Sequence, residues 1–177
     1  VCAREALWGM TREFEAAAAA EACRVCYFGA GSRLQEVLAE SGRHAVGGIG
    51  MQPVWDPRGW AAIVRGHAGV RAQLNRARNK GVVVERWQPE RAREDAQVRG
   101  CLESWIAARP MPAMRFMVEP YTLLGVLRDR VVLVARRGEA GGEVAGFLVA
   151  SPVPQRNGYL VEQIVRSPGA ANGTAEL

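Results

Sequence analysis

The stretch that decides the fold is residues 151–177, SPVPQRNGYLVEQIVRSPGAANGTAEL. Residues 159–165 are apolar or β-branched except for Glu162 and Gln163, which predicts a largely buried strand with a carboxylate and an amide on opposite faces. After Arg166, the segment 167–173 contains Pro, Asn and two Gly residues and predicts a turn-rich loop. Thr174 then suits the N-cap of a helix. Together these elements predict backbone N–H groups that face an anion or a developing oxyanion.

The region before this stretch predicts an antiparallel sheet. Apolar runs at 131–137 and 144–150 predict two strands joined by a Gly-rich turn, and Asn157-Gly158 is a typical hairpin turn into the strand at 159–165. A helix is expected from Pro89, with apolar residues at helical spacing as far as Ile106. A helix followed by three consecutive antiparallel strands, a loop and a helix is the order of a GNAT-type acyltransferase core.

The first 80 residues predict a similar alternation of elements. Helical patterns begin at Arg4 and Ser32, and strands are expected at 24–28 and 43–49. We therefore predict an α/β fold of the α+β kind, built from tandem GNAT-like halves with mainly antiparallel sheets flanked by helices and truncated at both ends. The expected division gives residues 1–80, the end of the first half plus basic linker helices, and residues 81–177, the second half without its final helix and strands.

Positive charge is concentrated in one segment. The chain of 177 residues has a net charge of +5, and residues 57–84 contain six basic residues and no acidic one. This clustering favours binding of a polyanion through Arg71, Arg76, Arg78 and Lys80, and a solvated face that binds nothing is the alternative. No apolar run reaches the roughly 20 residues of a membrane span, so any membrane contact of this segment is expected to be peripheral.

Several strings resemble the cytosolic domain of bacterial phosphatidylglycerol lysyltransferases. They are residues 46–57, the string RAQLNRARNKG at 71–81, residues 147–152 and residues 162–177, of which Ala171-Asn-Gly-Thr-Ala-Glu176 is the most specific. The resemblance covers nearly the whole chain. It implies an aminoacyltransferase that moves an aminoacyl group from aminoacyl-tRNA to a lipid hydroxyl, without a metal or a cofactor. It also implies anionic phospholipid as a partner and a cytoplasmic location at the inner face of the cell membrane, with tethering by membrane helices outside this segment left open.

The resemblance assigns roles to residues of the last strand and loop. Glu162 would orient the α-ammonium or act as the base, or instead form a structural ion pair with Arg166 or a cross-strand arginine. Arg166 would bind the terminal tRNA phosphate or tie down the loop, and the backbone at Asn172 and Gly173 would stabilise the oxyanion.

Three further residues, Ser151, Gln163 and Trp55, are assigned to the substrate pocket. The lysyltransferases have Asp-Leu-Met-Arg where this chain has Gln163-Ile-Val-Arg166. Since an Asp is thus replaced by Gln163, the amino acid carried stays open. For Trp55, stacking on a base and packing in the core are both considered.

Two other functions remain possible interpretations of the same residues. Arg166-Ser-Pro-Gly169-Ala-Ala171 fits the short R-x-x-G-x-A pattern with which GNAT enzymes bind the pyrophosphate of acetyl-CoA, which makes an acetyl-CoA-dependent N-acetyltransferase the first alternative. The second is a non-catalytic remnant that binds RNA or lipid. Neither His44 nor His67 stands in a readable nucleophile motif, so both are expected to be structural or surface residues.

Overall fold

The computed structural model describes residues 3–51, 53–110, 124, 129–138 and 141–177. The chain divides into two compact units, Val1–Trp55 and Asp56–Leu177, and each is described by itself. The division predicted at Gly81 falls inside the second unit. There α4 (Ala68–Asn79), before Gly81, packs against β1 (Val82–Trp87), after it. Contacts of this kind do not decide where two tandem halves join, so the division into halves stays a prediction.

The first unit consists of two helices and extended connections. Helix α1 (Arg4–Ala20) packs on α2 (Ser32–Glu40), and the buried side chains of the two helices are Thr11 and Leu38. The strands predicted at 24–28 and 43–49 were wrong, since neither segment is paired with another strand. Their polar side chains instead contact Glu15 of α1, through Tyr27 and His44.

The second unit contains a four-stranded sheet. Strands β1, β2 (Val131–Arg137), β3 (Glu143–Val153) and β4 (Gly158–Arg166) lie in the order β1-β2-β3-β4, and every neighbouring pair is antiparallel. A short turn of 3-10 helix, Pro154–Arg156, and Asn157 at φ 45° connect β3 to β4. The predicted α+β fold with an antiparallel sheet and flanking helices is therefore confirmed.

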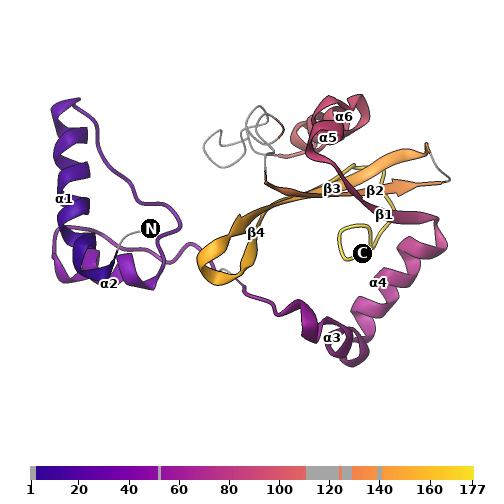
Figure 1. The fold of residues 1–177 in the computed structure, drawn as a ribbon, viewed down its shortest axis with the longest axis horizontal. Coiled ribbons are helices and arrows are strands. Elements are labelled where there is room, and N and C mark those ends of the chain that lie inside the picture. The colour runs from indigo at the N-terminus through magenta and orange to yellow at the C-terminus, as the bar shows by residue number, and fades with distance from the viewer. Residues whose placement is uncertain (1–2, 52, 111–123, 125–128, 139–140) are drawn as a thin grey trace. The chain divides into compact units, whose positions relative to one another are not determined.

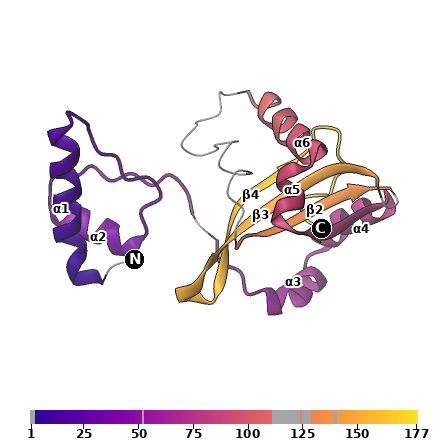
Figure 2. The same cartoon turned by 45° about the horizontal axis from the view of Figure 1, so that its top comes forward.

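One face of the sheet is covered by α5 (Pro89–Glu94) and α6 (Ala96–Ala107), as Figures 1 and 2 show. The register aligns Trp87, Val132 and Val149 in one row, and Val134, Phe147 and Val165 in the next. All six are buried and pack with α6 residues in the main hydrophobic core. Asp95 begins α6 by accepting hydrogen bonds from the N–H groups of Gln97 and Val98, as an N-cap does.

The opposite face carries α4 and the C-terminal loop, residues 167–177, which lie on the same side of the sheet in Figure 1. A second cluster of buried residues joins them, namely Ala77, Val82, Ala135 and Ala171, with Leu177 packed against it. Before α4, the chain forms a 3-10 turn (Pro57–Gly59) and the short helix α3 (Trp60–Gly66). The two faces of the sheet are thus covered by different parts of the chain.

The end of the chain differs from its prediction. No helix is assigned at 174–177, and the Thr174 hydroxyl donates to the Ala171 carbonyl instead of capping a helix. Gly173, at φ 91°, allows this loop to pack directly against the backbone of α4. A Cβ added there would lie 1.9 Å from the Gln73 carbonyl oxygen, so only glycine lets the loop approach the backbone of α4 so closely.

Candidate functional site

Glu162 lies at an irregularity of the edge strand. Val149 pairs with Gln163 and Ala150 pairs with Val161, which leaves Glu162 as an extra residue between two paired ones, a β-bulge. Strict alternation therefore fails at this point. Gln163 aligns with buried Val149 on the α5/α6 face, and Glu162 contacts Ser151 on that same face. The prediction that Glu162 and Gln163 lie on opposite faces was wrong because the bulge changes the direction of one side chain.

Two groups from other parts of the sheet contact the Glu162 carboxylate. The Ser151 hydroxyl on β3 donates to Oε1, and Nη1 of Arg130, the residue before β2, lies 3.4 Å from Oε2. The side chains of Arg130 and Glu162 are 23% and 24% exposed. We call Arg130, Ser151 and Glu162 the bulge cluster. It lies beside the buried row of Val132 and Val149, so its backbone positions are fixed by the core.

Arg166 lies on the other face of the sheet. It pairs with Gly146, one residue beyond the buried pair Phe147 and Val165, so its side chain alternates to the α4 side. Among the described residues no ion pair joins Glu162 to Arg166. The structure therefore brings together Glu162, Gln163 and Ser151 of the predicted site residues, and separates them from Arg166. The catalytic roles of these residues stay predictions.

The C-terminal loop uses several of its own amides. Ser167 donates to Ala145, Ala170 donates to Ser167, and Thr174 donates to Ala171. Asn172 is exposed, whereas Gly173 is buried against α4. Fewer N–H groups are thus free for an anion than the sequence suggested, and the position of Gly173 has an explanation in packing alone. Oxyanion binding by the backbone of this loop stays a prediction.

The basic segment forms the exposed side of α4. Arg71, Arg76, Arg78 and Lys80 are all exposed, while Leu74 and Ala77 of the same helix are buried. Within the described ranges, none of the four basic side chains forms an ion pair. Arg71 has a structural contact as well, since its Nη1 donates to the Val64 and Arg65 carbonyl oxygens at the end of α3. We call Arg76, Arg78 and Lys80 the basic surface.

Trp55 belongs to the first unit, at its last residue, and is 61% exposed. Core packing therefore does not account for it in the structure. Its assignment to the substrate pocket stays a prediction. In the second unit, Cys101 is not suited to act as a nucleophile, because burial in the main core raises the pKa of its thiol to about 11.

Sequence reasoning missed two arrangements. Arg130 precedes a strand and carries no motif, and only the pairing of β2 with β3 places it near Glu162. The second lies in the first unit, where His44 Nε2 is 2.6 Å from Glu15 Oε1 and His44 Nδ1 is 2.8 Å from Ser41 Oγ. Tyr27 also donates to Glu15. A carboxylate and a histidine 29 residues apart give no sequence signal that they are in contact.

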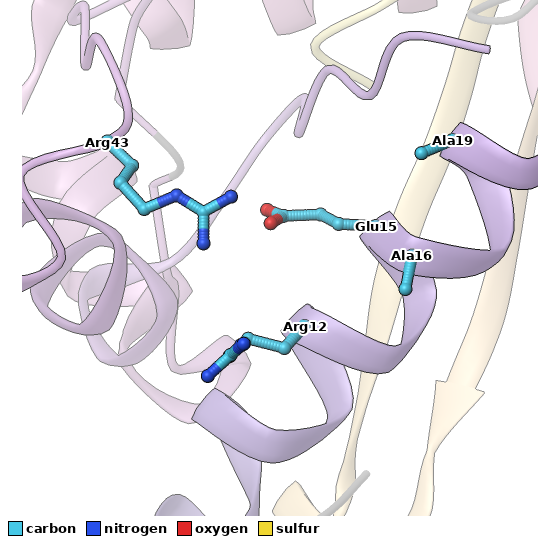
Figure 3. Close-up of a pocket in the computed structure, with 5 residues that line it drawn as sticks. All are labelled: Arg12, Glu15, Ala16, Ala19 and Arg43. Atoms are coloured by element: carbon cyan, nitrogen blue, oxygen red, sulfur yellow. The ribbon is translucent and has the colours of Figure 1, made fainter. Parts of the chain in front are cut away.

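A small pocket adjoins Glu15 and has a volume of about 200 Å³. It is lined by Arg12, Glu15, Ala16, Ala19 and Arg43, and Figure 3 shows the Arg43 guanidinium facing the Glu15 carboxylate, with the Arg12 side chain below them. Since Ser41 also donates to Leu38 and accepts from the Arg43 N–H, its hydroxyl is committed to ending α2. The Ser41–His44–Glu15 arrangement is therefore explained as a structural network.

Comparison with protein families decides the membership of the chain. The family model described as "Phosphatidylglycerol lysyltransferase, C-terminal" matches residues 1–177. The chain belongs to this family. Phosphatidylglycerol lysyltransferases are transferases, and the family membership confirms the resemblance seen in the sequence. No match to the chain was found among curated proteins.

Two solved structures are similar to this lysyltransferase-family chain. One is the C-terminal domain of a putative lysylphosphatidylglycerol synthetase from Agrobacterium fabrum, with 17% identity, a TM-score of 0.45, and coverage of 62% of this chain and 34% of that one. The other is L-PGS from Bacillus licheniformis, with 20% identity, a TM-score of 0.44, and coverage of 62% and 33%. The chain thus spans about a third of each of these solved chains.

Two features are absent from the residues that the structure describes. No helix there is long and apolar enough to cross a membrane. No group of three or more His, Cys, Asp or Glu side chains that could hold a metal ion occurs in that same part of the chain.

Proposed function

We propose that this chain is part of an aminoacyltransferase that moves an aminoacyl group from aminoacyl-tRNA to the hydroxyl of an anionic phospholipid of the phosphatidylglycerol kind. The observation that carries the proposal is the bulge cluster, a carboxylate set into an edge strand of a chain that belongs to the lysyltransferase family. The lipid would be met at the inner surface of the cell membrane.

The reaction is a transesterification. The lipid hydroxyl oxygen attacks the ester carbonyl carbon, a new ester bond forms, and the bond to the ribose oxygen of the tRNA breaks. The proton lost by the lipid hydroxyl ends on that ribose oxygen. Such a reaction requires positioning, proton transfer and stabilisation of the oxyanion, and Glu162 is the group that this proposal places at the aminoacyl end.

The two faces of the sheet suit the two parts of aminoacyl-tRNA. The basic surface and Arg166 lie on the α4 side and complement phosphates, while the bulge cluster lies on the α5/α6 side. Because β4 is the last strand in the described sheet, a substrate that contacts both faces would pass over its edge. The tRNA body and the aminoacyl end would then be bound by different elements.

The acetyl-CoA alternative depends on the loop amides. Three of them are used within the loop and by β3, which leaves fewer donors for a pyrophosphate. Acetyl-CoA also carries no α-ammonium group for Glu162 to bind. A remnant that binds RNA or lipid without catalysis would need the basic surface and not the bulge cluster.

One experiment separates these functions. The full-length protein is incubated with phosphatidylglycerol vesicles and either radiolabelled aminoacyl-tRNA or radiolabelled acetyl-CoA, and label in the lipid is measured. We expect transfer from aminoacyl-tRNA only, and Glu162→Gln should lower it by at least about 100-fold, the usual scale for loss of an acid–base or positioning group.

The stability of the same variant provides the control. Because Glu162→Gln keeps the size of the side chain and an oxygen that can accept from Ser151, the melting temperature should change little compared with the rate. Glu103→Gln, at an exposed position on α6, should leave both rate and melting temperature unchanged. Full activity of folded Glu162→Gln protein would show that the site is assigned wrongly.

A further inference from the structure

The bulge cluster contains a donor that the fold does not use. Nη1 of Arg130 is buried and has no hydrogen-bond partner within the described part of the chain, although Glu162 Oε2 is 3.4 Å away. Arginine commonly meets a carboxylate through two parallel hydrogen bonds, and a buried N–H without a partner is costly. Here the guanidinium lies beside the carboxylate without such a fork.

We propose that Arg130 and Glu162 together bind the α-aminoacyl ester itself, with Glu162 accepting from the α-ammonium group and Arg130 donating to the ester carbonyl oxygen. This assignment rests on the function proposed above and makes it more specific. It gives Glu162 a binding role instead of that of a general base, and it makes Arg130 a catalytic residue.

The spacing of the two side-chain atoms fits this substrate. In an α-amino ester the nitrogen and the carbonyl oxygen are separated by about 2.7 to 3.6 Å, depending on rotation about the bond between them, as standard bond lengths dictate. The acceptor Oε2 and the donor Nη1 are 3.4 Å apart. The α-ammonium group can therefore donate to Oε2 while the carbonyl oxygen accepts from Nη1, and both hydrogen bonds can have ordinary lengths.

The surroundings hold the carboxylate in the required direction. The Ser151 hydroxyl donates to Oε1, so Oε2 is the oxygen left for the ammonium group. Ser151 is thus a positioning residue. The bulge directs Glu162 to the face on which Ser151 lies, while neighbouring Val149 is fully buried and fixes the backbone.

The interaction of Arg130 with the carbonyl oxygen becomes stronger during the reaction. When the lipid hydroxyl attacks, negative charge develops on the former carbonyl oxygen, and a guanidinium that already donates to it stabilises that charge. The charge returns to a carbonyl when the ribose oxygen leaves and takes the proton. Glu162 meanwhile keeps the α-ammonium group in place, which fixes the orientation of the ester.

The test compares two donors with the full-length protein and phosphatidylglycerol vesicles. One donor is aminoacyl-tRNA and the other is the same aminoacyl-tRNA acetylated on its α-nitrogen, which keeps the ester and removes the ammonium charge. We expect transfer from the acetylated donor to be at least about 100-fold slower, on the scale of losing a positioning group. The Glu162→Gln variant should discriminate between the two donors much less.

Arg130 is tested by a matched pair of variants. Arg130→Met removes the donor while keeping a side chain of similar length, and should lower kcat by about 100-fold, as loss of an oxyanion donor does. Arg130→Lys, which keeps a donor, should recover part of the rate. Arg99→Met, at an exposed position on α6, is the control and should have no effect.

The outcomes separate this inference from the function on which it rests. If the wild-type protein transfers nothing from either donor, the proposed function is wrong. If it transfers from both equally well, or if Arg130→Met keeps its kcat, the function stands and the assignment of Arg130 and Glu162 is overturned. Should Arg130→Met fail to fold, the kcat of Arg130→Lys tests the role of Arg130, and the comparison of the two donors on the wild-type protein tests that of Glu162.

Discussion

Two carboxylates, Glu15 in the first unit and Glu162 in the second, are paired with basic side chains for different reasons. Glu15 joins α1 to Tyr27 and His44 in a unit whose described helices bury only Thr11 and Leu38. Glu162 lies beside a large buried core that would exist without it. A carboxylate that connects otherwise weakly packed segments serves structure, whereas one supported by a packed sheet is available for function.

The difference shows that resemblance to a catalytic arrangement is a poor guide by itself. The Ser41–His44 and His44–Glu15 contacts are shorter than that of Arg130 with Glu162. Yet the Ser41 hydroxyl ends a helix and Glu15 Oε1 already accepts from two partners, so the hydroxyl and this oxygen have structural roles. In the bulge cluster, by contrast, a buried donor has no partner.

The largest effect is expected where the packing of the second unit is tightest. Gly173→Ala would place a methyl group 1.9 Å from the Gln73 carbonyl oxygen at a positive φ, and should destabilise the second unit by about 3 kcal/mol, the upper range for overpacking. Thermal unfolding measures this. Gly169→Ala, in the same loop but with open space around it, should change little. Equal effects of both variants would mean that the loop is not seated on α4.

A smaller effect is expected from titrating the first unit. The hydrogen bond from His44 lowers the pKa of Glu15 below its ordinary value of 4.5, although burial acts in the opposite direction. Because the folded pKa is the lower one, this contribution to stability is present above about pH 4.5 and is lost as the pH falls through the folded pKa.

The first unit is also expected to lose stability at high pH. Burial, followed by the charge of Glu15, raises the pKa of Tyr27 above its ordinary value of 10.0, so its contribution is present below pH 10 and is lost at higher pH. Unfolding measured from pH 3 to pH 11 should show the first unit losing stability at both ends. In Glu15→Gln the acid-side loss should disappear, and its persistence would contradict the structural role of Glu15.

The smallest effect in free energy concerns the basic surface. Replacing Arg76 and Arg78 with Ala should leave folding unchanged and reduce the salt dependence of tRNA binding, since each neutralised phosphate contributes close to one unit to the slope of log K against log salt. Arg93 and Arg99, exposed on the opposite side of the sheet, provide the matched double variant. Equal slopes for both variants would make α4 an ordinary solvated face.

How far the sequence predicted this molecule depended on whether local pattern or pairing decided the outcome. The strands expected at 131–137 and 159–165 followed from periodicity and turn residues, because their apolar faces meet a common core. The single helix expected from Pro89 to Ile106 is instead two helices, α5 and α6, because Asp95 is extended and caps the second one. The strands expected at 24–28 and 43–49 failed because β-rich composition forms a strand only where a partner strand is present.

The candidate site was predicted in part for a similar reason. Glu162 stood out as a carboxylate in an apolar strand, and Ser151 was assigned to the same pocket. Its partner was expected to be Arg166, four residues away and therefore on the same face under strict alternation. The bulge at Glu162 interrupts that alternation, so the two side chains lie on opposite faces. Arg130 became visible only when three strands were placed side by side, since register is not encoded in any one segment.

The bulge at Glu162 also limits which insertions and deletions this hairpin can accept. Residues 158–161 lie beyond the bulge, and the extra residue at 162 determines which residue of β3 each of them pairs with. Deleting one residue from 159–161 would permit a regular ladder in which Glu162 pairs with Ala150 and its side chain turns to the face opposite Ser151. Changes of chain length between residues 158 and 162 should therefore be rare among functional variants of this protein, whereas changes in the turn at 154–157 should be tolerated.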